Sequence, residues 1–145
     1  MRTLKQIIPV VSFFLFFSMC TEDKNSSDTD DLISQGTHRY IAYDSTGVTI
    51  VDGFLTIIFE GSNQLGGEWQ LDAVGDPQNI GLQVGEGWLI GTVNQDTIWI
   101  NLNPDWDDNN VYLDGILQDS SFSGQWTWAG FPGVFNYGTF IAEAQ

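Results

Sequence analysis

Glycine is the feature that most constrains the fold of this chain. All 16 glycines lie at or beyond Gly36, and no stretch beyond residue 32 shows a sustained helical period. Short runs rich in Val, Ile, Thr and aromatic residues recur there instead, separated by Gly, Asn, Asp, Ser or Pro. This pattern predicts β-strands joined by tight turns.

Eight strands are expected, at residues 38–44, 53–60, 65–73, 85–93, 97–103, 110–118, 121–129 and 136–144. The connections are too short for crossover helices, so neighbouring strands should run antiparallel. Closure into a ring removes exposed strand edges. The sequence therefore predicts an all-β protein with an antiparallel up-and-down eight-stranded barrel; a two-sheet β-sandwich is the alternative.

Two strands show clear alternation, with Leu65, Gly67, Trp69 and Leu71 on one face of the first. In the second, Phe122, Gly124, Trp126 and Trp128 share a face. These faces should point inward. The large side chains Trp69, Leu71, Trp126 and Trp128 either pack the core or line a ligand cavity. A buried indole needs a hydrogen-bond acceptor, and Gln70, Asn101 and Gln125 are candidates.

The Gly-x-Trp pattern at strand starts and the closing run Gly138-Thr139-Phe140 resemble small lipocalin- and avidin-like barrels over roughly residues 38–144. The resemblance implies the eight-stranded barrel. It implies no site, because the order and spacing of residues do not match the biotin-binding residues of avidins.

The first residues have the pattern of an export signal. Arg2 and Lys5 precede an apolar run over residues 7–17, which is about half the length needed to span a bilayer. Cys20, the only cysteine, follows at once and resembles the lipobox cysteine of bacterial lipoproteins. The resemblance implies a signal peptide at 1–19 and fatty acylation, such as palmitate, on Cys20. The protein would then be anchored in the cell envelope, in the outer membrane and with surface exposure as a further expectation.

Residues 20–31 are polar and acidic after the cysteine, which predicts a solvated tether for a domain at 32–145. Within that domain Arg39 is the only Lys or Arg, whereas fourteen Asp and Glu residues are present. Such a charge repels phosphate backbones and anionic lipid surfaces. Nucleic acid is therefore excluded as a partner.

Catalytic motifs are lacking in the sequence. His38 is the only histidine and is expected to be a half-exposed residue at the start of a strand. A Ser-His or Cys-His nucleophile, a phosphate-binding loop and a zinc site all need residues in patterns that are missing here. No enzyme activity or cofactor is therefore expected. A glycoside hydrolase that uses two carboxylates is kept as an alternative.

The run from Asn103 to Asn110 is rich in carboxylates and amides. Asp105, Asp107, Asp108 and Asn109 offer the oxygen ligands that calcium prefers. The alternative is a turn whose Asn and Asp side chains bond their own backbone, with Trp106 folded over the end of the barrel.

Together these features predict a lipid-anchored envelope lipoprotein. Its barrel would be a non-catalytic module that binds a small apolar or sugar-like ligand, or a protein partner. A purely structural lipoprotein with a solid barrel is the second possibility, and the hydrolase is the third. An open cavity lined by tryptophan would favour ligand binding, and two buried acids facing each other would favour hydrolysis.

Overall fold

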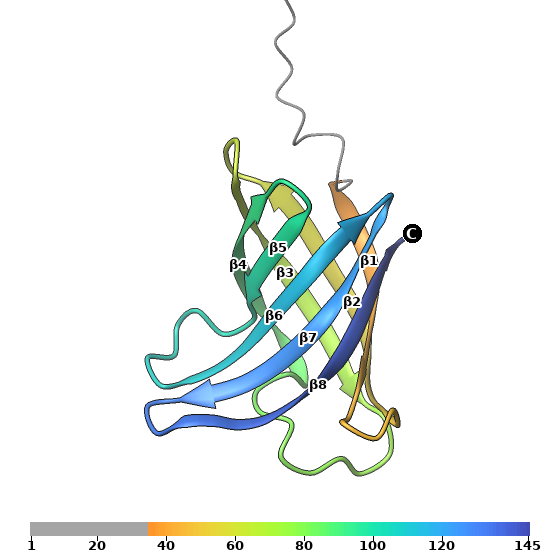
Figure 1. Ribbon diagram of the computed structural model, residues 1–145, viewed down its shortest axis with the longest axis vertical. Coiled ribbons are helices and arrows are strands. Elements are labelled where there is room, and N and C mark those ends of the chain that lie inside the picture. The colour runs from red at the N-terminus through yellow and green to blue at the C-terminus, as the bar shows by residue number, and fades with distance from the viewer. Residues whose placement is uncertain (1–34) are drawn as a thin grey trace, which may run out of the picture.

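A computed structural model describes residues 35–145 as one closed antiparallel β-barrel (Figure 1). Its strands are β1 (Gly36–Tyr43), β2 (Thr49–Phe59), β3 (Gln64–Ala73), β4 (Gly85–Asn94), β5 (Thr97–Asn101), β6 (Asn109–Gln118), β7 (Ser121–Gly130) and β8 (Gly133–Ala144). Each strand pairs with its neighbours in the chain, and β8 pairs with β1 to close the ring. The all-β class and the up-and-down barrel are confirmed, and the sandwich is excluded.

One strand begins earlier than its glycine suggested. β2 starts at Thr49, four residues before Gly53, which was expected to open the strand. Gly53 lies inside the strand, where a Cβ would be 2.2 Å from the carbonyl oxygen of Gln70 on β3. The glycine allows close approach of two backbones, a role that sequence alone does not distinguish from a strand boundary.

The barrel interior is filled by side chains from all eight strands. The faces predicted to point inward do so, since Leu65, Trp69, Leu71, Phe122 and Trp126 are all buried. The largest fully buried side chains are Trp126, Tyr40, Phe122, Phe140, Leu55 and Ile57. The aromatic residues of the sequence therefore supply much of the core volume.

The loop between β3 and β4, residues 74–84, covers one end of the barrel. Its Gln83 side chain is buried, where it accepts a hydrogen bond from the Tyr40 hydroxyl at 3.3 Å and donates to the carbonyl of Ile80 at 2.6 Å. Asn136 on β8 donates to the carbonyl of Asn79 at 2.8 Å. These bonds satisfy buried polar groups and hold the loop across the end of the barrel.

The two ends of the barrel differ in their connections (Figure 1). Short turns join β2 to β3, β4 to β5 and β6 to β7 at the end where β1 begins. The long loops 74–84 and 102–108 lie at the opposite end, which we call the loop end. The outer wall between the two ends presents the outward-facing side chains of every strand.

Candidate functional site

The residues that the sequence placed at a ligand cavity lie in or against the packed core. Trp69, Leu71 and Trp126 are buried core residues, and Trp128 is partly buried against them. At the loop end the ring of Trp128 packs near Gly81 and contacts Phe135, with ring centroids 4.8 Å apart. The structure therefore brings the predicted residues together as packing groups.

The two central indoles donate to backbone carbonyls. Trp69 Nε1 lies 2.7 Å from the carbonyl oxygen of Leu102, and Trp126 Nε1 lies 2.8 Å from that of Tyr43. The side-chain acceptors suggested by the sequence are placed elsewhere. Gln70 and Gln125 are exposed on the outer wall, and the Asn101 amide donates to Asn110.

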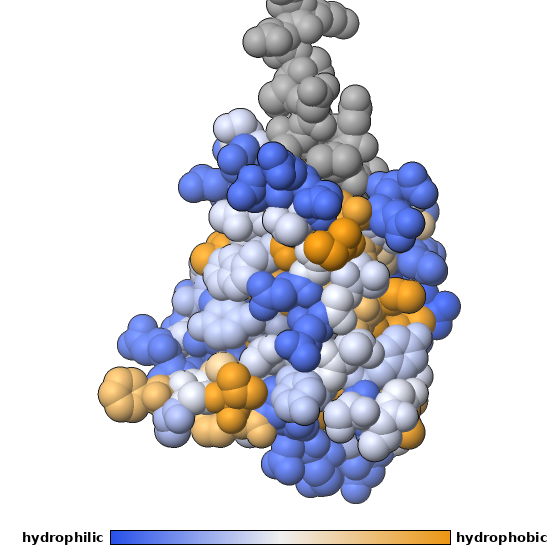
Figure 2. All heavy atoms as spheres, in the orientation of Figure 1, coloured by the Kyte–Doolittle hydropathy of each residue, from blue (hydrophilic) through white to orange (hydrophobic). Residues whose placement is uncertain are grey.

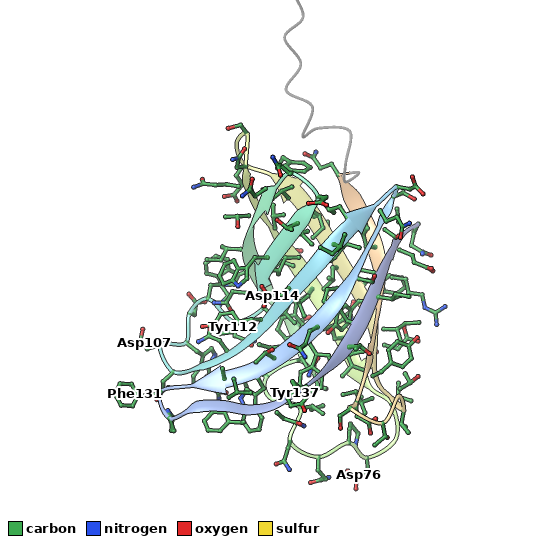
Figure 3. All side chains as sticks on the ribbon, viewed as in Figure 1. Asp76, Asp107, Tyr112, Asp114, Phe131 and Tyr137 are labelled. Carbon is green, nitrogen blue, oxygen red and sulfur yellow. The ribbon has the colours of Figure 1, made fainter. Side chains whose placement is uncertain are left out.

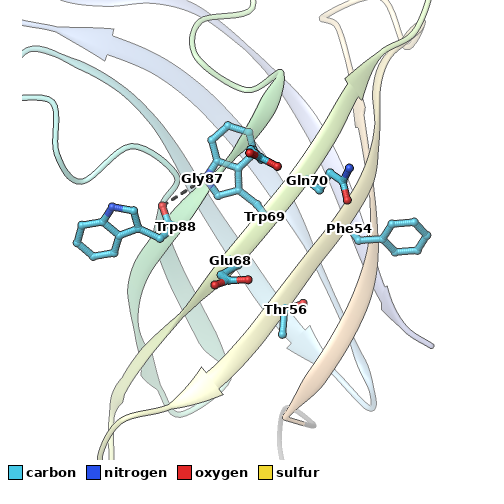
Figure 4. Close-up of a pocket in the computed structure, with 8 residues that line it drawn as sticks. Phe54, Thr56, Glu68, Trp69, Gln70, Gly87 and Trp88 are labelled. Atoms are coloured by element: carbon cyan, nitrogen blue, oxygen red, sulfur yellow. Dashed lines mark hydrogen bonds between the residues drawn. The ribbon is translucent and has the colours of Figure 1, made fainter.

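A groove of about 560 Å³ lies on the outer wall over β2, β3 and β4 (Figure 4). Two half-exposed aromatic rings stand at its sides, Phe54 from β2 and Trp88 from β4. The polar residues that line it are Thr56, Glu68, Gln70 and Glu86. Its volume falls within the usual range for small-molecule sites, roughly 300–1,000 Å³.

Strand register sets the arrangement of the groove. Phe54, Gln70 and Glu86 are directly opposite one another across the three strands and form one row. The adjacent row is Thr56, Glu68 and Trp88. Each row therefore has one aromatic ring at one end, and the two rings lie at opposite sides of a central polar strip.

A hydrogen bond from the loop end fixes the orientation of Trp88. Its Nε1 donates to Oδ2 of Asp105 at 2.6 Å, and Asp105 belongs to the loop between β5 and β6. A bond to a carboxylate is stronger than a neutral one. The ring is 46% exposed and yet held, so its face is preorganised for contact with a ligand.

The sequence-based site prediction covered only inward-facing residues, whereas Phe54 and Trp88 of the groove face outward. The alternation of inward and outward side chains along a strand could have identified them. Phe54 precedes the inward Leu55, and Trp88 precedes the inward Leu89, so both rings had to point outward. What the sequence did not show was that these two rings flank one groove.

The charge of the groove is negative. Glu68 and Glu86 are both exposed within it. Arg39 on β1 is engaged elsewhere, since its guanidinium pairs with Asp52 at 2.9 Å. The hydrogen bond from Arg39 lowers the pKa of the Asp52 carboxyl, and the same bond raises the pKa of Arg39.

The residues suggested for calcium do not converge on one point. Asp105 accepts from Trp88, and Asn109 Oδ1 accepts from the indole of Trp128 at 2.6 Å. Asp107 and Asp108 are exposed. Among residues 35–145, no group of three or more His, Cys, Asp or Glu side chains is placed to hold a metal ion.

Side-chain amides stabilise this loop instead. Asn103 Oδ1 accepts from the backbone of Val111 at 3.0 Å, and Asn110 Nδ2 donates to the carbonyl of Trp106 at 2.8 Å. This is the pattern expected of a turn held by its own Asn residues. Trp106 itself is exposed to solvent.

His38 differs from its expected half-exposed position, because β1 turns its side chain into the barrel. The residue is fully buried, with its ring edge-on to Phe122 at a centroid distance of 5.5 Å. Nδ1 lies 3.3 Å from the carbonyl oxygen of Gly36, and Nε2 is buried with no hydrogen-bond partner in the described part of the chain. Burial lowers the pKa of His38, so the ring is neutral at pH 7.

The described residues thus define a closed eight-stranded β-barrel with a filled interior and an aromatic groove on its outer wall. This is the architecture that the resemblance to lipocalin- and avidin-like barrels implied. No protein-family model, curated protein or solved structure matches the chain. Residues 35–145 include no helix long and apolar enough to cross a membrane. Cys20 and the segments 1–19 and 20–31 lie outside the described residues.

Proposed function

We propose that this protein is a lipid-anchored lipoprotein of the cell envelope whose barrel binds a neutral, sugar-like ligand without catalysis. The binding site is the groove between Phe54 and Trp88. The observation that carries the proposal is the pair of half-exposed rings on either side of a polar strip, in a groove of about 560 Å³.

The chemistry of the groove suits a sugar. The C–H faces of a pyranose ring are apolar and can stack on an aromatic face, while its hydroxyls need donors and acceptors at the edges. Phe54 and Trp88 supply the faces, and Thr56, Glu68 and Gln70 supply the polar groups. Glu68 and Glu86 would repel an acidic sugar, so the ligand is neutral.

The filled interior favours the outer wall over the cavity of a carrier. Tyr40, Trp126 and Phe140 occupy the space in which a lipocalin-like barrel would hold a ligand, and loop 74–84 covers one end. A small barrel either packs its interior or holds a ligand there.

Binding without hydrolysis fits the two acids of the groove. A glycoside hydrolase needs one carboxyl group that stays protonated and one that is ionised, which requires different environments. Glu68 and Glu86 are both exposed to solvent on neighbouring strands. Nothing in the geometry separates their environments, and this supports a binding role.

The location is inferred from the sequence. Acyl chains on Cys20 would anchor the protein in the outer membrane, where it would be exposed at the surface. The acidic segment 20–31 would hold the barrel at a distance from the membrane. The groove would then face the surroundings of the cell from the side wall of the barrel.

Calorimetric titration of the full chain with a panel of neutral oligosaccharides tests the proposal. We expect saturable binding of at least one, weakened about tenfold or more by Trp88→Ala or Phe54→Ala, because each removes a stacking face. Trp106→Ala removes an exposed indole outside the groove and should leave affinity unchanged.

Three results would count against this function. If no oligosaccharide binds, the purely structural alternative is favoured. If Trp106→Ala weakens binding as much as Trp88→Ala, the site is not the groove. Release of shorter sugars during the titration would instead support the hydrolase, and Glu68→Gln should then abolish the release.

A further inference from the structure

A second aromatic surface lies farther round the outer wall of the barrel and is centred on Trp99 of β5. Three grooves, of about 330, 350 and 270 Å³, are lined in part by Trp99 and together extend over the outer wall from β3 to β8. Figure 2 shows the β5 to β8 side, where apolar and pale surface of intermediate hydropathy interrupts the hydrophilic surface. Tyr112 and Asp114 of β6 and Tyr137 of β8 lie on this face (Figure 3).

The centre of this surface is built and held in place. Trp99 and Tyr112 stack with ring centroids 5.6 Å apart and an angle of 26° between their planes. Tyr112 is directly opposite Asn101 on β5, whose amide donates to Asn110 at 2.9 Å. The two rings therefore form a fixed platform on two hydrogen-bonded strands, β5 and β6.

The charge around the platform has one sign. Asp114 is directly opposite Trp99 on β6 and lines two of the grooves, and Glu60 lines the third. None of the residues that line these three grooves is a Lys or Arg. An occupant that brings positive charge of its own would complement these carboxylates.

We infer that this Trp99 surface docks a basic, lysine- or arginine-bearing segment of a partner protein. A cation over the face of an aromatic ring is attracted by the ring quadrupole, and a nearby carboxylate adds to that attraction. The three grooves extend over six strands, which suits an extended chain segment more than a single compact cation.

Charge complementarity also decides against other occupants. A second copy of this domain cannot supply the charge, because Arg39 is its only cation beyond residue 32 and is paired with Asp52. A nucleic acid or an anionic lipid surface carries the wrong sign. The inference is independent of the sugar groove, because none of the residues that line that groove lines the three grooves around Trp99.

The experiment titrates the ¹⁵N-labelled full chain with a nine-residue peptide of alternating lysine and serine. The same peptide with acetylated lysines serves as its uncharged control. We expect chemical-shift changes centred on the Trp99 indole and on the amides of Tyr112 and Asp114. Acetylation should weaken binding about tenfold or more, because it removes both the cation–π and the ionic contact.

Two charge-matched variants locate the site. Asp114→Asn should lower the affinity for the lysine peptide about fivefold or more. Asp119→Asn removes the same charge at the turn after β6 and should change that affinity less than about twofold. Trp99→Ala should lower the affinity for the lysine peptide to a similar extent. Trp99→Phe keeps an aromatic ring and serves if the alanine variant does not fold.

Four outcomes would overturn the inference. These are no binding, equal binding of the acetylated peptide, equal weakening by Asp119→Asn, and shifts spread evenly over the acidic surface. The last two would mean that the peptide follows net charge alone. Failure here leaves the sugar groove untouched, because oligosaccharide affinity is measured separately and depends on Phe54 and Trp88.

Discussion

The indole of Trp126 lies over Gly138, directly opposite it on β8, and donates past that glycine to the carbonyl of Tyr43 at 2.8 Å. A Cβ at residue 138 would be 2.1 Å from the same carbonyl oxygen and 2.6 Å from the indole nitrogen. The glycine therefore leaves the space that this buried hydrogen bond needs. The same arrangement is found across the barrel, where Trp69 lies over Gly87.

Gly138→Ala should therefore destabilise the fold by about 1–3 kcal/mol, since the added methyl overpacks the core and displaces a buried donor from its acceptor. Gly61→Ala is the matched control, because a Cβ there meets nothing within 4 Å. That variant should change the free energy of unfolding by less than about 0.5 kcal/mol. Urea denaturation of both variants measures the difference, and equal stabilities would mean that Gly138 has no special packing role.

Stability should fall as the solution is made mildly acidic, because of His38. Its folded pKa lies below the ordinary value of 6.5, so above pH 6.5 the ring is neutral in both states and has no effect. As the pH falls below that value, the unfolded state binds a proton that the folded state does not. Stability therefore decreases down to the folded pKa, and below it both states are protonated and the loss stays constant.

His38→Phe should remove this dependence while keeping a ring against Phe122. Unfolding midpoints at pH 7.5 and 5.5 are the measurement. The wild type should lose stability between them and the variant should not. A variant with the same loss would show that another group is responsible.

Asp105→Ala should free the indole of Trp88 without unfolding the barrel, because Asp105 is exposed. We expect the Trp88 indole N–H signal to shift and broaden, and sugar affinity to fall about threefold to tenfold as preorganisation is lost. Asp107→Ala removes an equal charge from the same loop, and its carboxylate accepts no hydrogen bond from residues 35–145. An equal effect of both variants would point to loop charge as the cause.

Cys20→Ala should move the protein from the membrane fraction to the soluble fraction and abolish incorporation of labelled fatty acid. The reason is that acyl chains on this residue are the proposed anchor. Ser26→Ala, in the tether, should remain membrane-bound. A Cys20→Ala variant that stays in the membrane fraction would show that acylation there is not the anchor.

Much of the architecture could be predicted because β-sheet signals are local. Alternation along residues 65–71 and 122–128 showed which side chains point inward, and the short connections required antiparallel neighbours. Closure of the ring followed from strand number and the need to remove edges. Strand boundaries were less accurate, since Gly53 and the start of β8 depend on contacts with neighbouring strands.

The candidate sites were harder to predict, since they depend on distant pairings. Phe54 and Trp88 are separated by a whole strand and a long loop in the sequence, and only the register of β2, β3 and β4 sets them at the two sides of one groove. Asp105 reaches Trp88 because the loop 102–108 brings its carboxylate beside β4. The burial of His38 likewise depends on β2, β7 and β8, which surround it.

The sequence by itself determined the all-β class, the inward faces, the acidic character and the export pattern. Each of these depends only on neighbouring residues or on composition. Only the tertiary structure decided that the interior is filled and that the outer wall holds two aromatic surfaces with different lining residues. The physical reason is that cavity and groove alike are set by how side chains from non-adjacent strands meet. That meeting depends on register and on the closure of the ring.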